Sequence, residues 1–219
     1  MHFVVTAGPT REHIDPVRFL SNPSTGRMGF AVARAARAAG HNVTLIAGPV
    51  SLRAPDGVRR VDVVSACDML AAVRAALDET KNGPAALVMT AAVADWRPDK
   101  CASRKLKKSQ MDGTLHLVRN PDILKTLDRS LAKSVKAKLV RVGFAAETGD
   151  PVSEAARKCR EKGLDLVVAN DVSRTDSGFG TSTNRVVLAF PDGKTEPLPL
   201  MTKLAVAKRI VREVERIFA

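Results

Sequence analysis

Residues 2–47 read HFVVTAGPTREHIDPVRFLSNPSTGRMGFAVARAARAAGHNVTLIA, and the fold class follows from their pattern. Residues 2–7 are a short apolar run closed by a Gly-Pro pair, as expected of a buried parallel strand followed by a loop. Residues 8–27 hold three prolines and show no apolar period, which predicts a long loop of the kind that usually carries function. Residues 28–39 are rich in alanine and arginine and end at a glycine, as helices often do. Residues 42–47 are apolar again, so the stretch predicts a strand, a long loop, a helix and a second strand.

The alternation of strands and helices continues towards the C-terminus. It predicts a three-layer, Rossmann-like α/β fold with a mainly parallel sheet, in a single domain covering residues 1–219. The helix at residues 121–131 would begin with a proline, which the first helical turn tolerates. Apolar runs predict further strands at residues 61–65, 86–90, 115–118, 138–144 and 164–169. Amphipathic stretches predict further helices at residues 67–77, 151–163 and 204–218.

A late segment departs from this alternation. Residues 185–190 and 194–198 flank a Pro-Asp-Gly turn and predict an antiparallel β-hairpin, at about residues 184–198. Val186, Leu188 and Phe190 alternate on one face of it. The pattern alone fits two arrangements, an edge packed on its own domain or a surface that pairs with a second copy of the chain.

The composition describes an ordinary globular protein. Of the 219 residues, 45% are hydrophobic and 26% are charged. The sequence has no run of 18 or more apolar residues, so it predicts no membrane-spanning helix. The N-terminus lacks the features of a signal peptide, and we therefore expect a cytoplasmic protein. The three cysteines and four histidines are scattered, which argues against a disulfide framework or a zinc site.

The formal net charge of +12 implies an anionic partner. Nucleic acid is one candidate. However, the chain has 7 phenylalanines, 1 tryptophan and no tyrosine, and it shows no known nucleic-acid-binding motif. The basic residues lie in short separate clusters, which favours small phosphorylated substrates.

The first two predicted strand-to-loop junctions offer candidate binding residues, because ligands of parallel sheets bind at the carboxyl ends of the strands. Gly26, preceded by Ser24 and Thr25, opens a helix whose backbone amides suit a phosphate. The alternative is a purely structural loop. After residues 86–90, the sequence Ala91-Ala92 lets a ligand approach the backbone, and Asp95 follows as a metal–phosphate or sugar ligand, or as a plain turn residue.

Residues 104–109 (RKLKKS) crowd four cations into five positions. They predict a mobile flap, about residues 100–112, that closes on a polyanion, or else a solvated basic loop. Residues 119–124 lead into a predicted helix and could bind a base or a sugar, or simply cap that helix.

Two further features lie towards the end of the chain. Phe144 follows a strand and could border a base or belong to the core. Lys158 and Lys162 are four residues apart on a predicted helix and could converge on a triphosphate. Alternatively they form a solvated face on which Glu154 pairs with Lys158.

Together these motifs resemble the phosphopantothenoylcysteine synthetase family, the second half of the bifunctional bacterial flavoprotein of coenzyme A biosynthesis. One segment reads Asn-Pro-Ser-Thr-Gly-Arg-Met-Gly where the family usually has Asn-x-Ser-Ser-Gly-Lys-Met-Gly, and both changes keep a hydroxyl or a charge. The matching segments are residues 6–11 (TAGPTR), 15–22 (DPVRFLSN), 90–95 (TAAVAD), 105–108 (KLKK), 120–124 (NPDIL), 143–148 (GFAAET) and 164–172 (LDLVVANDV).

The resemblance implies a ligase that joins 4'-phosphopantothenate to cysteine through an acyl-nucleotide, with release of pyrophosphate and a nucleoside monophosphate. It implies Mg²⁺ held mainly by the phosphates, CTP rather than ATP as the nucleotide, and a homodimer. The flavin-binding decarboxylase half is absent from this sequence, so we expect no flavin, and possibly a separate decarboxylase as a partner. No nucleic acid or membrane partner is implied.

The resemblance also assigns roles by position. Asn22 would orient the acyl intermediate and Arg18 would support the same loop, while Lys105 in the flap would meet the triphosphate. The nucleotide would be held by Ala91, Ala92, Asp95, Lys105, Asn120, Pro121, Asp122, Ile123, Phe144, Lys158 and Lys162. The alternatives are a nicotinamide-dependent oxidoreductase, against which the dinucleotide glycine pattern is missing, and a basic nucleic-acid-binding module.

Overall fold

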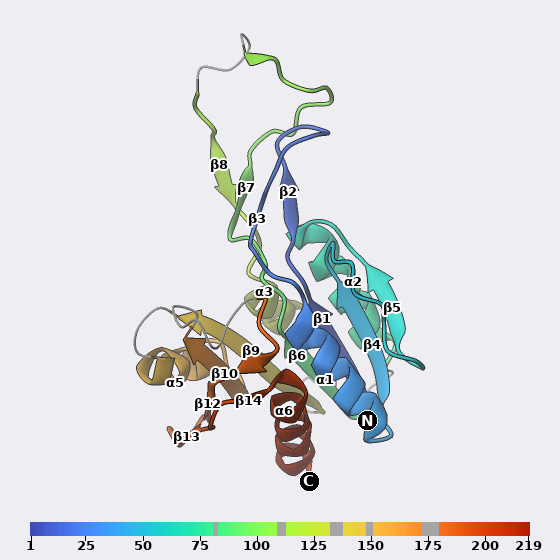
Figure 1. Cartoon of the computed structure of the whole chain (residues 1–219), viewed down its shortest axis with the longest axis vertical. Coiled ribbons are helices and arrows are strands. Elements are labelled where there is room, and N and C mark those ends of the chain that lie inside the picture. Colours follow the sequence, from blue (N-terminus) through green and yellow to red (C-terminus); the bar gives the residue numbers. More distant parts are fainter. Residues whose placement is uncertain (81–82, 109–112, 132–137, 148–150, 172–179) are drawn as a thin grey trace.

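The computed structural model describes residues 1–80, 83–108, 113–131, 138–147, 151–171 and 180–219. Its centre is an eight-stranded sheet with the order β13-β12-β10-β9-β6-β1-β4-β5 (Figure 1). All pairs from β5 to β10 are parallel, and β12 and β13 are antiparallel. The strands are β1 (His2–Ala7), β4 (Asn42–Ala47), β5 (Arg59–Asp62), β6 (Ala85–Met89), β9 (Leu139–Glu147), β10 (Leu166–Asp171), β12 (Val186–Ala189) and β13 (Thr195–Pro197).

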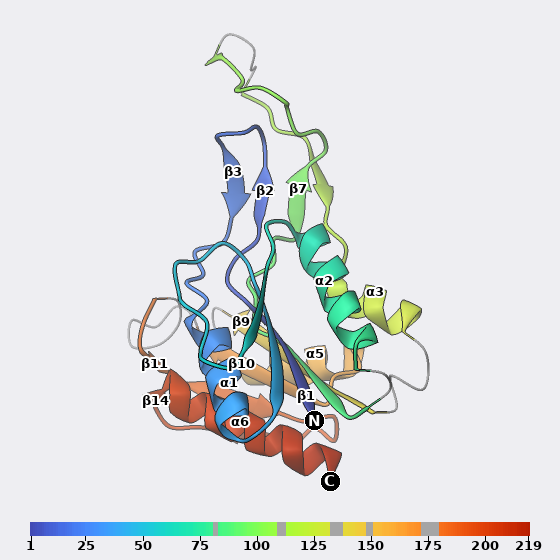
Figure 2. The same ribbon diagram turned by 90° about the vertical axis from the view of Figure 1, so that its right-hand side faces the viewer.

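Helices cover both faces of the sheet and give the predicted three layers (Figure 2). Helices α1 (Arg27–Ala38) and α6 (Lys203–Phe218) lie on one face, and α2 (Ala66–Asp78), α3 (Ile123–Ser130) and α5 (Pro151–Glu161) lie on the other. Successive residues of β1 point to opposite faces: Phe3 and Val5 pack in the cluster under α1 and α6, and Val4 in the cluster under α2 and α3. The predicted α/β fold with a mainly parallel sheet is confirmed.

Local sequence explains where the helices begin. Ser65 accepts a hydrogen bond from the amide of Asp68, whose carboxylate accepts one from the amide of Ser65, so α2 opens with a capping box. The side chain of Thr202 caps α6 in the same position. The predicted helix start at Pro121 was wrong, because Asp122 is the N-cap of α3 and the proline precedes it.

Two antiparallel ribbons project beyond the carboxyl ends of the parallel strands, as Figures 1 and 2 show. One pairs β2 (Arg11–His13) with β3 (Phe19–Ser21), and the other pairs β7 (Trp96–Pro98) with β8 (Leu117–Arg119). We call these two ribbons and the described residues between β7 and β8 the arm. The long loop predicted over residues 8–27 therefore contains a short β-ribbon that the sequence did not predict.

The late hairpin forms, but its apolar face is not available to a second copy. Val186 and Leu188 on β12 and Phe190 just after it are at most 7% exposed, in the same core cluster as Val206 and Ile210 of α6. β12 also pairs with β10, which makes the hairpin the antiparallel edge of the main sheet. Of the two arrangements that the pattern fits, the structure has the edge packed on its own domain, and the pairing of this face with a second copy is wrong. Among the described residues, no helix combines the length and the hydropathy needed to cross a bilayer.

Candidate active site

The loops after β1 and β6 meet at the centre of the sheet. The chain runs outward from β1 through β4 to β5 and then returns to β6 on the other side of β1, so β1 and β6 flank the point where the strand order reverses. The amide of Ala92 donates to the carbonyl of Gly8 (2.9 Å), and the amide of Thr10 donates back to Ala92 (3.3 Å). Open α/β sheets bind their ligands at such a switch point.

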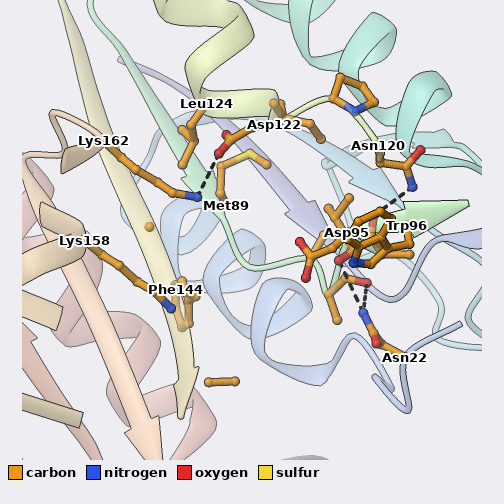
Figure 3. A pocket seen from close by; sticks show the side chains of 18 of the residues that line it. Asn22, Met89, Asp95, Trp96, Asn120, Asp122, Leu124, Phe144, Lys158 and Lys162 are labelled. Carbon is orange, nitrogen blue, oxygen red and sulfur yellow. Dashed lines mark hydrogen bonds and ion pairs between the residues drawn. The ribbon is translucent and has the colours of Figure 1, made fainter. Parts of the chain in front are cut away.

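A cavity of about 760 Å³ opens at this point, within the size range of small-molecule sites. We call it the main cavity (Figure 3). Most of the residues predicted to bind the nucleotide line it, and so does the predicted catalytic Asn22. The predicted residues in its wall are Asn22, Ala91, Ala92, Asp95, Asn120, Pro121, Asp122, Ile123, Phe144, Lys158 and Lys162.

One wall of the main cavity carries opposite charges. Asp122 caps α3 by accepting from the amide of Lys125 (3.1 Å), and its Oδ2 lies 3.2 Å from the Nζ of Lys162. Burial alone would raise the pKa of Asp122, but the Lys125 amide and the Lys162 ammonium outweigh burial and lower this pKa. Lys158 and Lys162 extend from the end of α5 into the same space in Figure 3, as their spacing predicted. The side chain of Glu154 lies outside the described residues.

Asn120 fixes the loop after β6. Its Nδ2 donates to the carbonyl of Ala94 (2.8 Å), and its Oδ1 accepts from Nη1 of Arg97 (3.0 Å). Its backbone amide donates to the carbonyl of Asp95 (2.8 Å). Asn120 therefore holds in place the segment that contains Asp95, whose side chain remains exposed beside the cavity.

Asn22 connects the first loop to the same segment. Its Nδ2 donates to the carbonyls of Ala92 (3.2 Å) and Val93 (3.3 Å). These two bonds hold the end of β3 at the mouth of the main cavity, opposite the lysines (Figure 3).

A second cavity of about 110 Å³ adjoins the first, and we call it the second cavity. The predicted phosphate-loop residues Ser24, Thr25 and Gly26 line it, together with residues of the first turn of α1. Gly26 has a φ of 75°, a left-handed conformation that favours glycine, and no side chain caps α1. Phe144 lines both cavities, which places it between the two spaces.

Arg18 and Lys105 lie outside both cavities, and their predicted roles remain predictions. Oδ2 of the buried Asp15 accepts from Nε (3.0 Å) and Nη2 (2.6 Å) of Arg18 and from the amide of Leu106 (3.1 Å). Nη2 of Arg18 also donates to the carbonyl of Leu106 (2.9 Å). The Arg18 guanidinium, with three backbone amides, holds the pKa of Asp15 well below its usual range. This clip binds one ribbon of the arm to the flap segment, on which Lys105 is exposed.

Sequence reasoning missed several residues of the site. Trp96, the chain's single tryptophan, lines the main cavity beside Arg119, whose guanidinium carbon lies 5.3 Å from the ring centroid. Lys203 and Asn170 line the second cavity. Asn170 belongs to the matching segment at residues 164–172, for which no site role was predicted, and no sequence signal singled out Lys203. Among the described residues, no group of three histidines, cysteines or carboxylates could hold a metal ion.

Comparisons with known proteins match the whole described fold. The family model of the DNA/pantothenate metabolism flavoprotein C-terminal domain matches residues 1–218. The coenzyme A biosynthesis bifunctional protein CoaBC of Bacillus subtilis is 47% identical over 214 residues, 97% of this chain and 50% of that protein. The same protein of Escherichia coli K12 is 42% identical over 217 residues, 98% of this chain and 51% of that protein. The chain thus spans about half the length of the curated relatives it matches.

Solved structures agree with this result. The crystal structure of the C-terminal domain of CoaBC superposes with a TM-score of 0.79 at 39% identity and covers 99% of this chain and 94% of that one. A mutant of Cab2, solved in complex with phosphopantothenate-cysteine, has the same fold at 18% identity, with a TM-score of 0.80 and coverage of 99% and 85%. The chain therefore belongs to the family of the DNA/pantothenate metabolism flavoprotein C-terminal domain, as its resemblance to phosphopantothenoylcysteine synthetases predicted.

Proposed function

We propose that this chain is a phosphopantothenate–cysteine ligase. The observation that supports this most is the main cavity, where the residues of the family's nucleotide motifs line one space beside Asn22. Among the described residues of its wall there is no serine, cysteine or histidine. Such a site suits a reaction that needs positioning and charge neutralisation rather than a protein nucleophile.

The reaction has two steps. A carboxylate oxygen of 4'-phosphopantothenate attacks the α-phosphorus of the nucleotide. The bond between the α-phosphorus and the oxygen that bridges it to the β-phosphate breaks, and pyrophosphate leaves. The amine of cysteine then attacks the acyl carbon, loses a proton, and expels the nucleoside monophosphate as the amide forms. Lys158 and Lys162 neutralise the phosphates in the first step, and Asn22 holds the acyl group for the second.

CTP is the proposed nucleotide, with ATP as the alternative. Phe144 and the backbone around residues 120–123 would border the base and sugar at one end of the main cavity. Mg²⁺ would be held mainly by phosphate oxygens and water, as is usual for this ion, and would neutralise part of the charge of the triphosphate. Asp95 is exposed at the cavity and is the carboxylate best placed to accept a hydrogen bond from a water bound to that ion.

We also propose that the chain acts as a homodimer, with a decarboxylase as a possible further partner. Because the apolar face of the hairpin is buried in its own domain, the proposed interface must lie on another surface. Large apolar side chains that are 38–57% exposed gather on the arm, including Val17, Phe19, Leu117 and Val118. A second copy that covers them would remove this apolar surface from water. Sedimentation of the wild type and of a Leu117→Asp, Val118→Asp variant tests this, and a monomeric wild type would end the proposal.

The function is tested by pyrophosphate release. The protein is incubated with 4'-phosphopantothenate and each of the four nucleoside triphosphates in turn, without cysteine. The proposal predicts pyrophosphate formation that depends on phosphopantothenate and is fastest with CTP. Pyrophosphate release that ignores phosphopantothenate, or none with any nucleotide, would contradict it.

A further inference from the structure

The cysteine of the proposed reaction carries a carboxylate, and this charge needs a cation to bind it. The carboxylate and the amine share one carbon atom, so a group that binds the carboxylate also aims the amine at the acyl carbon. The described residues that line the main cavity include three cations, Lys158, Lys162 and Arg119. The two lysines lie at the end of α5 and have the phosphates as their proposed partners. Arg119, on β8, is the cation that remains for the carboxylate.

Arg119 lies on the side of the main cavity where Asn22 is found. It is paired with Trp96 across the antiparallel strands β7 and β8, so the two side chains share one face of the ribbon. Trp96 follows shortly after Ala92 and Val93, whose carbonyls accept from Asn22. Figure 3 shows Trp96 on the side of Asn22 and away from the lysines. A ligand bound at Arg119 would therefore lie near the proposed position of the acyl group.

The indole of Trp96 holds the guanidinium of Arg119 by its face. The guanidinium carbon lies 5.3 Å from the ring centroid, within the range of a cation–π interaction. This contact leaves the N–H groups at the edge of the guanidinium available, and their planar fork matches the two oxygens of a carboxylate. Within the described part of the chain, no aspartate or glutamate forms an ion pair with Arg119. Trp96 is 45% exposed and Arg119 is also exposed, so a ligand can reach the pair.

The backbone that carries Arg119 is fixed to the rest of the site. Nη1 of Arg97 donates to the carbonyl of Arg119 (2.8 Å) and to Oδ1 of Asn120 (3.0 Å). Nδ2 of Asn120 in turn donates to the carbonyl of Ala94 (2.8 Å). Arg119 is thereby held against the same loop to which Asn22 is bonded, which lowers the cost of ordering it when a ligand binds.

The cavity wall near this pair also suits the side chain of cysteine. Pro23, which follows Asn22, and Val93, which lies three residues before Trp96, both line the main cavity. A thiol behaves as a small hydrophobic group, so it would pack on apolar atoms of this kind. A cation beside apolar groups fits a ligand with a carboxylate and a short apolar side chain.

We infer that Arg119, stacked on Trp96, is the subsite for the carboxylate of the incoming cysteine, and that it aims the amine at the acyl group beside Asn22. The inference rests on the proposed ligase function for the identity of its ligand, and it gives the second substrate of that reaction a binding site. The phosphate of 4'-phosphopantothenate is another anion that a guanidinium binds, and the experiment separates these two sources.

The test compares cysteine with cysteamine, which has the same amine and thiol but no carboxylate. Rates of amide formation are measured with CTP, 4'-phosphopantothenate and either amine. The wild type should prefer cysteine in kcat/KM, and in Arg119→Met this preference should fall about ten- to hundredfold, the usual effect of losing a charged hydrogen bond. The loss should come from the KM for cysteine, while the KM for CTP stays within about threefold. Because each amine is compared with itself in the two proteins, their different basicities cancel.

Three further variants separate the charge from its surroundings. Arg119→Lys keeps the charge without the planar fork and should restore part of the preference. Trp96→Leu removes the stacking and should raise the KM for cysteine about two- to fivefold. Arg129→Met is the matched control, because Arg129 is an exposed arginine in the last turn of α3 that lines neither cavity, and it should react like the wild type.

A measurement on the wild type covers the case in which Arg119→Met fails to fold. Fluorescence of Trp96, the single tryptophan of the chain, is followed with CMP and 4'-phosphopantothenate present, so that no ligation takes place. Cysteine should change the emission saturably, and cysteamine should not do so at the same concentrations. Equal responses to both amines, including none, or an unchanged preference in a folded Arg119→Met protein, would overturn the inference. A rise confined to the KM for 4'-phosphopantothenate would also overturn it, since Arg119 would then bind the other anion.

The outcomes for this inference and for the ligase proposal are independent. A protein that forms no amide, but whose Trp96 emission responds to cysteine and not to cysteamine, would contradict only the ligase function. A protein that ligates normally, with the same preference for cysteine in Arg119→Met, would contradict only the subsite.

Discussion

Replacing Asn22 by aspartate should separate the two proposed chemical steps. The amide of Asn22 donates to the carbonyls of Ala92 and Val93 at 3.2 and 3.3 Å. An aspartate has nearly the same shape but no donor, so its carboxylate would face two carbonyl oxygens. Losing both bonds costs about 1–3 kcal/mol at the usual net value of each, which corresponds to roughly five- to 150-fold in the rate of a step that needs this geometry.

The second step should carry this loss. Asn22 lines the main cavity opposite Lys158 and Lys162, which we propose to neutralise the phosphates, so activation of the carboxylate should continue in Asn22→Asp. The acyl-nucleotide should then accumulate, and mass spectrometry of quenched reactions detects it directly. Pyrophosphate release during the first turnover should stay within about threefold of the wild type, a difference of less than 1 kcal/mol.

The control is Asn42→Asp, the same change at an exposed residue. Asn42 is the first residue of β4, so it lies at the amino ends of the parallel strands, away from the cavities. It should turn over like the wild type and accumulate nothing. If Asn22→Asp turns over normally, the assignment of Asn22 is refuted. If its pyrophosphate release slows as much as amide formation, Asn22 acts on the loop as a whole and not on the second step.

Three further predictions concern the arm and the helix beside the second cavity. Trypsin should cut within residues 104–108 in the free protein and more slowly with CTP and 4'-phosphopantothenate present, and equal cutting in both states would argue against closure. Asp15→Asn should expose the same segment to trypsin even with ligands present. Because Arg18 lowers the pKa of Asp15 from 3.8, the carboxylate should stay charged and hold the clip at any pH above 3.8. The clip should be lost only at a lower pH, where Asp15 takes up a proton. Gly29→Ala should reduce the free energy of unfolding in urea by about 1–3 kcal/mol, since its Cβ would lie 2.5 Å from the Cβ of Ala7, and an unchanged urea midpoint would show that α1 can shift freely.

Much of the fold could be predicted because its signals are local. The runs at residues 2–7 and 42–47 are buried strands whose predicted bounds agree with the structure, since strands of a parallel sheet that is covered on both faces are apolar throughout. The ribbons of the arm could not be found in this way. β2 and β7 have three residues each, with charged residues and a proline, and tertiary contacts hold them, such as the hydrogen bond from the amide of Arg11 to the carbonyl of Val64 (2.8 Å).

The hairpin shows a different limit of the sequence. An alternation such as that of Val186 and Leu188 predicts one buried face, but it does not tell which surface covers it. In the structure that surface is α6 of the same chain.

The candidate site was predictable as far as it lies in motifs that follow strands. Lys162 and Asp122 come from separate motifs, and the order of the strands brings them within 3.2 Å. Lys203 begins an amphipathic helix with the pattern of any surface helix, so its burial follows only from the packing of α6 beside the first turn of α1. The same holds for Trp96, whose place at the cavity depends on the ribbon that the sequence did not reveal.

As a ligase, this chain would form one amide bond for each nucleoside triphosphate that it consumes. The direct measurement follows a complete reaction with 4'-phosphopantothenate, cysteine, CTP and Mg²⁺ by mass spectrometry and quantifies all products. The ligase function predicts one 4'-phosphopantothenoylcysteine, one pyrophosphate and one CMP for each CTP consumed, and no amide without cysteine. CTP hydrolysis without the amide, or release of CDP and phosphate in place of CMP and pyrophosphate, would contradict it.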